Sequence, residues 1–456
     1  MKLFNDLKLK FEHPDWSRNP EFGLLDTILE QNPSLYAHLK DDIAEGMSPS
    51  KFGRKDTPTI EQIVRAAIFK ELKGIDYREL EYAQSDSRIC ATFIKLDERD
   101  PFSFQVLQKF ISKISAESLE KVLIDINQIA MDQGLESLES IRTDSTEVET
   151  NIHYPTNNSL VWDCIKESHR LLKHLKEETQ GLSYRDYRRS AKKNHYKINN
   201  IKSKEKRVKL FHKQLTTFVK SINQVDQVVR NPKKKGYSLR GTVLIEKLKE
   251  HLKVMRKVYD VTHRKEIKGE RVPNEEKIFS IYEPHTDIIV KGAREVKFGH
   301  KVNLTGGKSN LIVDCQIVEG NTSDQKLYKP SIENIENNYN ILPKNVSVDG
   351  GYASKENMEY SQGKGIVNIV FNKVVGSLKS QATSQKMETM LKKWRSGIEA
   401  VISNFKRGYN MVRCNWKGKQ HYKAKVLWSV IAYNVRTMTR LVLEKIINND
   451  TAKHMG

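Results

Sequence analysis

The spacing of hydrophobic residues predicts that the first 135 residues are mainly helical. In residues 59–74, apolar side chains recur from Ile60 to Ile68 at the three- and four-residue intervals of one helix face. Thr59 is placed to cap this helix and Gly74 to end it. The same period recurs in residues 76–86, 102–115 and 116–133. A compact bundle of short helices is therefore expected.

The pattern changes to β near residue 138. One strand is predicted around 140–148, and amphipathic helices then follow over 159–178, 188–229 and 242–266, with Asn231-Pro232 as a break. Short apolar or alternating runs predict further strands at 278–284, 287–292, 297–305, 310–318, 342–349 and 365–372. Gly306-Gly307 is expected to join two of them as a hairpin. The early strand must pair with the later ones, because its apolar face otherwise has no partner.

Two more helices are predicted after the strands, one over 388–405 despite Gly397 and one over 421–446. A strand separated from its sheet by a long helical stretch indicates an insertion into an α/β domain. The expected domains are a helical N-terminal domain (1–135), an α/β core (136–160 and 271–415), a helical insertion (161–270) and a C-terminal helix packing on the core (416–456).

Charge sharpens this division of the chain. The chain has 78 Lys and Arg against 57 Asp and Glu, a formal net charge of +21. Residues 1–180 have a balance of −9, 181–270 of +18, 271–390 of +1 and 391–456 of +11. Positive charge concentrated in one segment is typical of nucleic-acid binding. The alternative is a solvated helical surface without a partner, which the self-repulsion of such a segment disfavours.

Cysteine usage and hydropathy exclude several other classes of protein. The four cysteines lie far apart and form no CxxC pair, so neither a zinc module nor a disulfide framework is expected. No apolar run has the length of a membrane helix, and the first residues lack the core of a signal peptide. A cytoplasmic protein is expected.

Three acidic residues stand out as candidate catalytic groups. Asp144 lies on the early predicted strand, Asp349 ends a later strand before Gly350-Gly351, and Glu399 lies on the helix after the last strand. Carboxylates from two strands and one helix can meet at one edge of a sheet. Because they repel one another, such groups normally bind divalent cations, and oxygen ligands favour Mg²⁺ or Mn²⁺. Two such ions can promote phosphodiester cleavage. Singly, each acid is more often a turn or surface residue.

Arg395 and Lys406 flank Glu399 at spacings of four and seven residues, so one helix would place all three on one face. A basic pair beside a metal-binding acid suits a phosphate backbone. The alternative is an ordinary surface salt bridge, which contributes only about 0.3–0.5 kcal/mol.

These residues resemble the motifs of DDE transposases of bacterial insertion sequences. Thr-Asp-Ser-Thr at Asp144, Asn-Val-Ser-Val-Asp-Gly-Gly-Tyr at Asp349 and Arg-x3-Glu-x6-Lys at Glu399 are similar to the three acidic motifs of that family. Lys-Phe-Gly-His-Lys-Val-Asn-Leu (297–304) and Glu-Gly-Asn-Thr-Ser-Asp (319–324) also resemble it. The Tyr of the third motif is replaced by Lys392, and the large insertion follows the first strand, whereas many relatives carry it before the Glu helix.

The resemblance implies a ribonuclease H-like mixed sheet flanked by helices, in which Asp144, Asp349 and Glu399 hold two Mg²⁺ or Mn²⁺ ions. It implies cleavage of DNA at the terminal inverted repeats of a transposon and strand transfer into target DNA. Residues 136–160 and 271–415 would then be the catalytic core, residues 161–270 a basic helical insertion, and residues 1–135 a domain for DNA-end binding or dimerisation. Arg395 and Lys406 would contact phosphates, and insertion residues would bind duplex backbone. Those residues are Arg185, Arg188, Arg189, Lys192, Lys193, Lys233, Lys234 and Lys235. The expected partners are double-stranded DNA and a second protomer, in a nucleoid-associated complex.

Three alternatives remain open on the sequence. The first is an inactive relative that binds DNA, against which the three intact acids argue. The second is a metal-dependent nuclease of the same fold that cuts without joining. The third is a basic helical scaffold for nucleic acid in which the acids are incidental.

Overall fold

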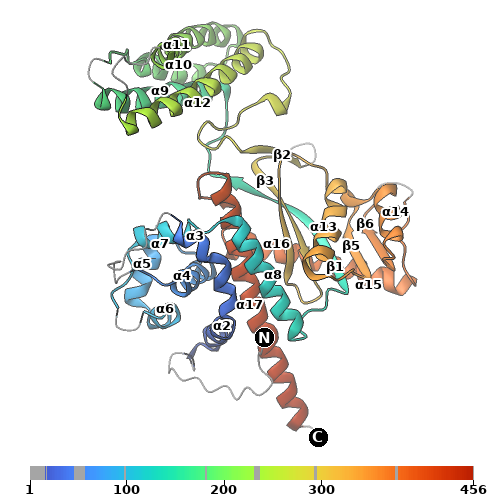
Figure 1. Cartoon of the computed structure of the whole chain (residues 1–456). Helices are drawn as coiled ribbons and strands as arrows, with labels where there is room; N and C mark the ends of the chain where they lie inside the picture. The colour runs from blue at the N-terminus through green and yellow to red at the C-terminus, as the bar shows by residue number, and fades with distance from the viewer. Residues whose placement is uncertain are drawn as a thin grey trace. The chain divides into compact units, whose positions relative to one another are not determined.

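The structure is a computed structural model that describes residue 16 and residues 18–45, 57–96, 99–179, 182–230, 237–291, 295–374 and 378–454. The chain forms two compact units (Figure 1). One consists of Met1–Asn151 and Ile289–Gly456, and the other consists of Ile152–Ile288. The second unit therefore interrupts the sequence of the first. Within the described residues, no helix is long and apolar enough to cross a membrane.

Short helices make up the N-terminal part of the first unit. They are α2 (Pro20–Gln31), the 3-10 helix η1 (Pro33–Leu39), α3 (Lys40–Ala44), α4 (Ile60–Lys73), α5 (Tyr77–Asp86), α6 (Arg88–Ile94), α7 (Phe104–Ile111) and α8 (Ala116–Asp132). The expected cap of α4 is confirmed, because the Thr59 hydroxyl accepts from the amide of Gln62 and the Gln62 side chain returns to the Thr59 amide. Gly74 ends this helix with a φ of 65°. Its left-handed backbone is the conformation that glycine adopts without strain.

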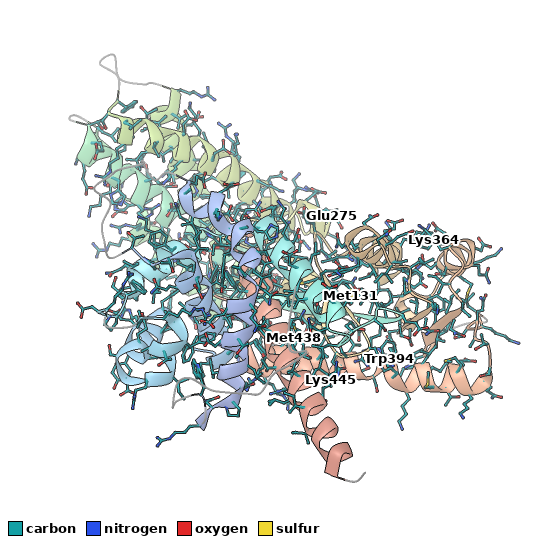
Figure 2. All side chains as sticks on the ribbon, turned by 60° about the horizontal axis from the view of Figure 1, so that its bottom comes forward. Met131, Glu275, Lys364, Trp394, Met438 and Lys445 are labelled. Atoms are coloured by element: carbon teal, nitrogen blue, oxygen red, sulfur yellow. The ribbon has the colours of Figure 1, made fainter. Side chains whose placement is uncertain are left out.

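The long C-terminal helix α17 (Lys419–His454) packs against these helices. It lies beside α2, α4 and α8. Figure 2 locates α8 by its Met131 label and α17 by its Met438 label. Buried residues of the helices share one hydrophobic core with α17 and with one face of the sheet, including Trp428, Val302 and Leu304. The segment predicted as a separate domain of residues 1–135 therefore shares its core with the rest of the first unit.

A seven-stranded mixed sheet forms the centre of the first unit. Its strands are β1 (Ser140–Thr150), β2 (Asp287–Lys291), β3 (Glu295–Gly306), β4 (Ile312–Val318), β5 (Asn345–Asp349), β6 (Asn368–Asn372) and β7 (Arg413–Cys414). The main order is β2-β3-β1-β5-β6, with β4 on β3 and β7 on β1. β3 is antiparallel to β1 and β4, whereas β5 is parallel to β1 and β6. The expectation that the early strand pairs with the later ones is confirmed.

Helices cover both faces of this sheet. α13 (Asp324–Tyr339) and α14 (Lys355–Gly363) share a hydrophobic core with the strands. This core includes Ile141, Val346 and Val348. Ser347, which lies between the two valines on β5, instead donates to the carbonyl of Leu391 on α15 (Gln385–Arg395). Alternate residues of a strand point to opposite faces. α15 therefore covers the face opposite to α13, and the sheet is enclosed in an α/β arrangement.

The second unit is a bundle of four helices with a core of its own. The helices are α9 (Asn157–Glu178), α10 (Arg188–Asn200), α11 (Lys204–Arg230) and α12 (Leu239–Thr262), followed by the π-helical turn η2 (His263–Ile267) and the 3-10 turn η3 (Asn274–Glu276). The core residues include Leu172, Phe218 and Leu248, each fully buried. Each helix is amphipathic and cannot bury its apolar face alone, so the bundle is the unit of stability.

Two expectations for this region are wrong. The single helix predicted over 188–229 is two helices, because Ile201 is extended (φ −94°, ψ 129°) after Asn199 and Asn200, both of low helix propensity. The strand predicted over 278–284 is absent, since Ile278 and Ile281 pack against the bundle core. The break expected at Asn231-Pro232 lies outside the described residues.

Candidate active site

The sheet places Asp144 and Asp349 side by side. β1 and β5 are parallel, and their register pairs Thr143 with Val348, so the next residue on each strand is an aspartate. After Asp349 the chain turns through a short 3-10 helix, Gly350–Tyr352. A Cβ at Gly350 would lie 2.5 Å from the carbonyl oxygen of Lys373. Only glycine allows this close approach, which turns the chain directly behind the carboxylate.

Glu399 reaches the same place from a helix junction that the sequence did not predict. The single helix expected over 388–405 is wrong, because α15 ends at Arg395 and α16 (Gly397–Gly408) begins after Ser396. The junction is held by Arg142 of β1, which donates to the carbonyl of Trp394 and lies 4.6 Å from the centre of its ring. A Cβ at Gly397 would collide with the Arg142 guanidinium.

The guanidinium of Arg395 contacts all three candidate carboxylates. One of its nitrogens lies 3.4 Å from Asp144 Oδ2 and 3.8 Å from Asp349 Oδ1, and another donates to Glu399 Oε1. The Arg395 side chain is only 3% exposed, whereas Glu399 is 54% exposed. The structure therefore brings the three acids together around one buried cation, although they come from two strands and a helix far apart in sequence.

The surroundings of Asp144 oppose its ionisation. Burial, together with smaller contributions from the carboxylates of Asp349 and Glu399, raises the pKa of Asp144 to about 6. The Ser145 amide, which donates to Asp144 Oδ1 at 2.8 Å, and the charge of Arg395 act in the opposite direction. A carboxyl with a pKa raised by burial among other acids is typical of functional sites.

A second polar cluster supports the turn after Asp349. Lys301 of β3 donates to Asp324 Oδ1 at 2.9 Å, and the Ser145 hydroxyl donates to the same oxygen at 3.0 Å. Asp324 Oδ2 would lie 3.1 Å from a Cβ on Gly351. The sequence analysis does not predict Lys301 and Asp324 as site residues, although they lie in the segments 297–304 and 319–324 that resemble the family. That resemblance is the sequence feature that could have indicated them.

Lys406, which was predicted to contact a phosphate, pairs with an acid of β1 in this structure. Its ammonium lies 2.6 Å from Oε1 of Glu147, which is three residues after Asp144 on β1. The helix junction at Ser396 places Arg395 on α15, whereas Glu399 and Lys406 both lie on α16. Lys406 thus fixes α16 to β1 while remaining 29% exposed.

The predicted DNA-contacting residues of the second unit lie at the start of α10. Arg185 precedes the helix and stacks on Tyr187 at 5.7 Å, and Arg188 pairs with Asp186 at 2.9 Å. The remaining residues of this set in the described part are Arg189, Lys192 and Lys193, which are exposed on α10. Lys233, Lys234 and Lys235 lie outside the described residues.

The donor set of the acidic cluster suits a divalent cation in its chemistry. Three carboxylates that meet one cationic group supply the oxygen ligands that Mg²⁺ and Mn²⁺ prefer. In the described part of the chain, no three or more His, Cys, Asp or Glu side chains lie close enough together to hold a metal ion as they stand. The cation that the three acids share in this structure is Arg395.

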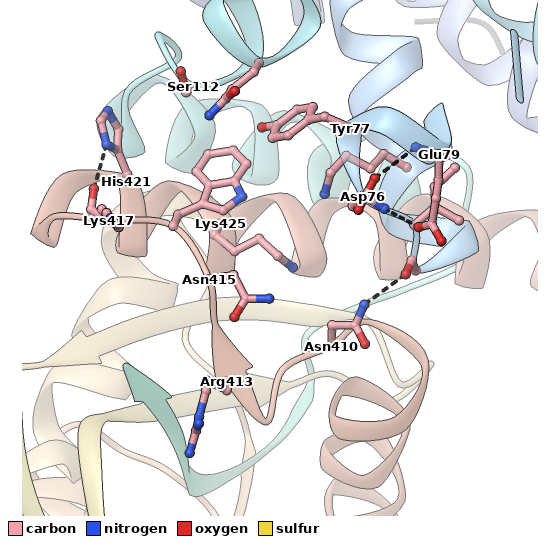
Figure 3. Close-up of a pocket in the computed structure, with 15 residues that line it drawn as sticks. Asp76, Tyr77, Glu79, Ser112, Asn410, Arg413, Asn415, Lys417, His421 and Lys425 are labelled. Atoms are coloured by element: carbon pink, nitrogen blue, oxygen red, sulfur yellow. Dashed lines mark hydrogen bonds between the residues drawn. The ribbon is translucent and has the colours of Figure 1, made fainter. Parts of the chain in front are cut away.

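A cavity elsewhere in the first unit has a different character. It has a volume of about 580 Å³ and is lined by residues of the α4–α5 turn, β7 and the start of α17 (Figure 3). Its polar groups mostly serve local structure: Asp76 caps α5, Asn410 donates to the Gly74 carbonyl, and Lys425 pairs with buried Glu71 at 2.7 Å. These contacts join the N-terminal helices to α17. The candidate acids are not among the residues that line this cavity.

Comparison with known proteins finds one family that matches part of the chain. Residues 289–435 match the family model of the transposase DDE domain. This segment contains Asp349, Arg395 and Glu399, whereas Asp144 precedes it. No curated protein and no solved structure matches the chain significantly. The resemblance to DDE transposases is therefore confirmed over residues 289–435, which are similar to the transposase DDE domain.

Proposed function

We propose that this chain is the transposase of an insertion sequence, which cleaves DNA at the terminal inverted repeats and transfers the freed strand into target DNA. The observation that carries the proposal is the meeting of Asp144, Asp349 and Glu399 around Arg395. The match to the transposase DDE domain supports it. The strand order β4-β3-β1-β5-β6, with β3 antiparallel to its neighbours, supports the ribonuclease H-like fold that the resemblance implies.

The three carboxylates would hold two Mg²⁺ or Mn²⁺ ions once the Arg395 guanidinium withdraws from them. Such ions supply an activated water or hydroxyl nucleophile and stabilise the leaving oxygen of a phosphodiester displacement. Arg395, which then has no carboxylate partner, would donate to a phosphate near the scissile bond. Its planar fork of donors suits a phosphate as well as it suits a carboxylate. Lys406, still partly exposed, would provide a second positive charge beside Glu399.

The second unit would bind the duplex backbone through Arg185, Arg188, Arg189, Lys192 and Lys193, together with Lys233, Lys234 and Lys235. Such contacts set position and affinity without reading sequence. The helical part over 1–135 would bind transposon ends or mediate dimerisation, because pairing two ends takes at least two protomers. The complex would act on DNA in the cytoplasm.

The test uses purified protein, Mg²⁺ and labelled DNA from the flanks of its own gene. Cleavage at the element ends, followed by joining to a target plasmid, is expected for the wild type. Asp144→Asn and Glu399→Gln are expected to lose both reactions. Glu359→Gln is the matched control, because Glu359 is a surface acid of α14 that pairs with Lys355 at 3.5 Å.

Each outcome separates the proposal from its alternatives. Cleavage that persists in the Asp144→Asn and Glu399→Gln proteins would disprove the site. Ends that are cut but never joined would indicate a nuclease of the same fold. DNA binding without any cleavage by the wild type would indicate an inactive relative.

A further inference from the structure

The four helices of the second unit divide into two pairs of different charge. α10, α11 and the turn between them, residues 188–230, hold 13 Lys or Arg residues and two acids. α9 and α12 together hold ten Lys or Arg residues and seven acids. α10 packs against α11, and α9 packs against α12. The positive charge of the unit is therefore concentrated on one pair of neighbouring helices.

A groove lies between these two basic helices. It has a volume of about 510 Å³, and its walls are Tyr196, Lys197, Asn200, Ile201, Lys206, Lys209, Leu210 and Lys213. Four of the eight residues are lysines and none is acidic. Tyr196 is 70% exposed. The groove thus combines four ammonium groups with a phenol and an amide, all of which can donate hydrogen bonds.

The four lysines differ from those on the opposite helix pair. Within the described residues, none of Lys197, Lys206, Lys209 and Lys213 forms an ion pair with a carboxylate. On α9 and α12, by contrast, three lysines form close pairs with acids one turn away. These are Lys166–Asp163 at 2.8 Å, Lys249–Glu246 at 2.5 Å and Lys253–Glu250 at 2.7 Å. Unpaired like charges within a Debye length repel, and a bound polyanion removes that repulsion.

The spacing of the lysines suits a regular row of negative charges. Lys206 and Lys213 are seven residues apart on α11, a rise of about 10 Å, which corresponds to about three phosphates along one DNA strand. On α10, Arg189, Lys193 and Lys197 follow one another at intervals of four residues and so extend one wall of the groove along the same face. Phosphates spaced along a polymer match this arrangement.

We propose that the α10–α11 groove binds the phosphodiester backbone of duplex DNA without reading its sequence. That the ligand is DNA rests on the proposed function. The inference adds to that function by assigning the main backbone contact to Lys197, Lys206, Lys209 and Lys213. The ligand is recognised by its row of phosphates.

The experiment measures binding of the full-length protein to a 40-base-pair duplex of unrelated sequence, without metal ions, from low to moderate salt. The test variant carries Gln at Lys197, Lys206, Lys209 and Lys213. The control variant carries Gln at Lys166, Lys173, Lys249 and Lys253, so both lose four charges from the same unit. The test variant is expected to bind at least about tenfold more weakly, with a log–log salt dependence shallower by about 3–4. The control is expected to remain close to the wild type.

Equal affinity and salt dependence for the test variant and the wild type would overturn the groove assignment. An equal loss of affinity in the control variant would also overturn it, because the change in net charge alone would then explain the weaker binding. Binding to an acidic polypeptide is measured in parallel. If the test variant loses only that binding and its affinity for the duplex is unchanged, the ligand of the groove is not DNA. End cleavage by the wild type in Mg²⁺ is scored separately, so the groove and the proposed function can fail independently.

Discussion

At the scale of single residues, the acidic cluster depends on one arginine. Arg395→Ala leaves three neighbouring carboxylates without their shared cation, so we expect a loss of about 1–3 kcal/mol in unfolding free energy at pH 7.5. The loss should shrink when Mg²⁺ is added and when the pH falls below about 6, where Asp144 takes up a proton. Thermal unfolding of the variant and the wild type, with and without Mg²⁺, measures both effects. A loss unaffected by Mg²⁺ and pH would show that Arg395 acts only by packing.

A second carboxyl gives a prediction about pH that is independent of the acidic cluster. Burial raises the pKa of Asp314 on β4 to about 6, although Gln316 and Asn334 donate to it. The folded state therefore holds this proton more tightly than the unfolded state, and stability falls as the pH rises from about 4 through 6. Asp314→Asn avoids that loss and should be more stable than the wild type by about 2–3 kcal/mol at pH 7.5.

Denaturant titrations at several pH values test the effect of Asp314→Asn. The difference between variant and wild type should vanish below about pH 4, where both side chains are neutral. Glu359→Gln again serves as the control, because its acid is on the surface. A stability difference that is the same at pH 4 and pH 7.5 would contradict the linkage.

The sequence identified the acids but missed most of their partners. Asp144, Asp349 and Glu399 lie in short motifs that can be read locally, and the four-residue spacing of Arg395 and Glu399 indicated their contact. Arg142 holds Trp394, 252 positions away, and Lys301 holds Asp324 across β3 and the start of α13. Such contacts depend on how strands and helices pack, and no local spacing encodes them.

At the scale of elements, the junction between α15 and α16 determines where Glu399 points. Gly397→Ala places a Cβ against the Arg142 guanidinium. We expect it to cost about 1–3 kcal/mol of stability and to reduce cleavage, because Glu399 follows two residues later. Gly408→Ala is the matched control, since it is also in α16 and a Cβ there has no atom within 4 Å. Thermal unfolding and end-cleavage assays of both variants measure the difference. Equal behaviour would mean that the junction tolerates the added carbon.

The elements that the sequence misassigned share one physical cause. Hydrophobic periodicity reports which residues are buried but not what buries them. Residues 278–284 include a short apolar run of the kind found in strands, yet Ile278 and Ile281 pack on a helix bundle. Residues 188–229 have one continuous helical period, but the chain reverses at Ile201, so α11 packs back on α10. Periodicity thus indicates which residues are buried, and the tertiary partner determines which element they form.

At the scale of the whole molecule, the two units have separate cores, and this predicts separate folding. All buried residues in the core of the second unit, from Leu160 to Val258, lie within Ile152–Ile288. A fragment of residues 152–288 should therefore be helical by circular dichroism and unfold cooperatively without the first unit. The same transition should appear in the full chain beside that of the first unit. Leu248→Ala creates a cavity in the bundle core. It should destabilise only this transition, with a loss of about 2–5 kcal/mol in its unfolding free energy. A fragment without cooperative unfolding, or a single transition that Leu248→Ala shifts as a whole, would show that the bundle depends on the first unit.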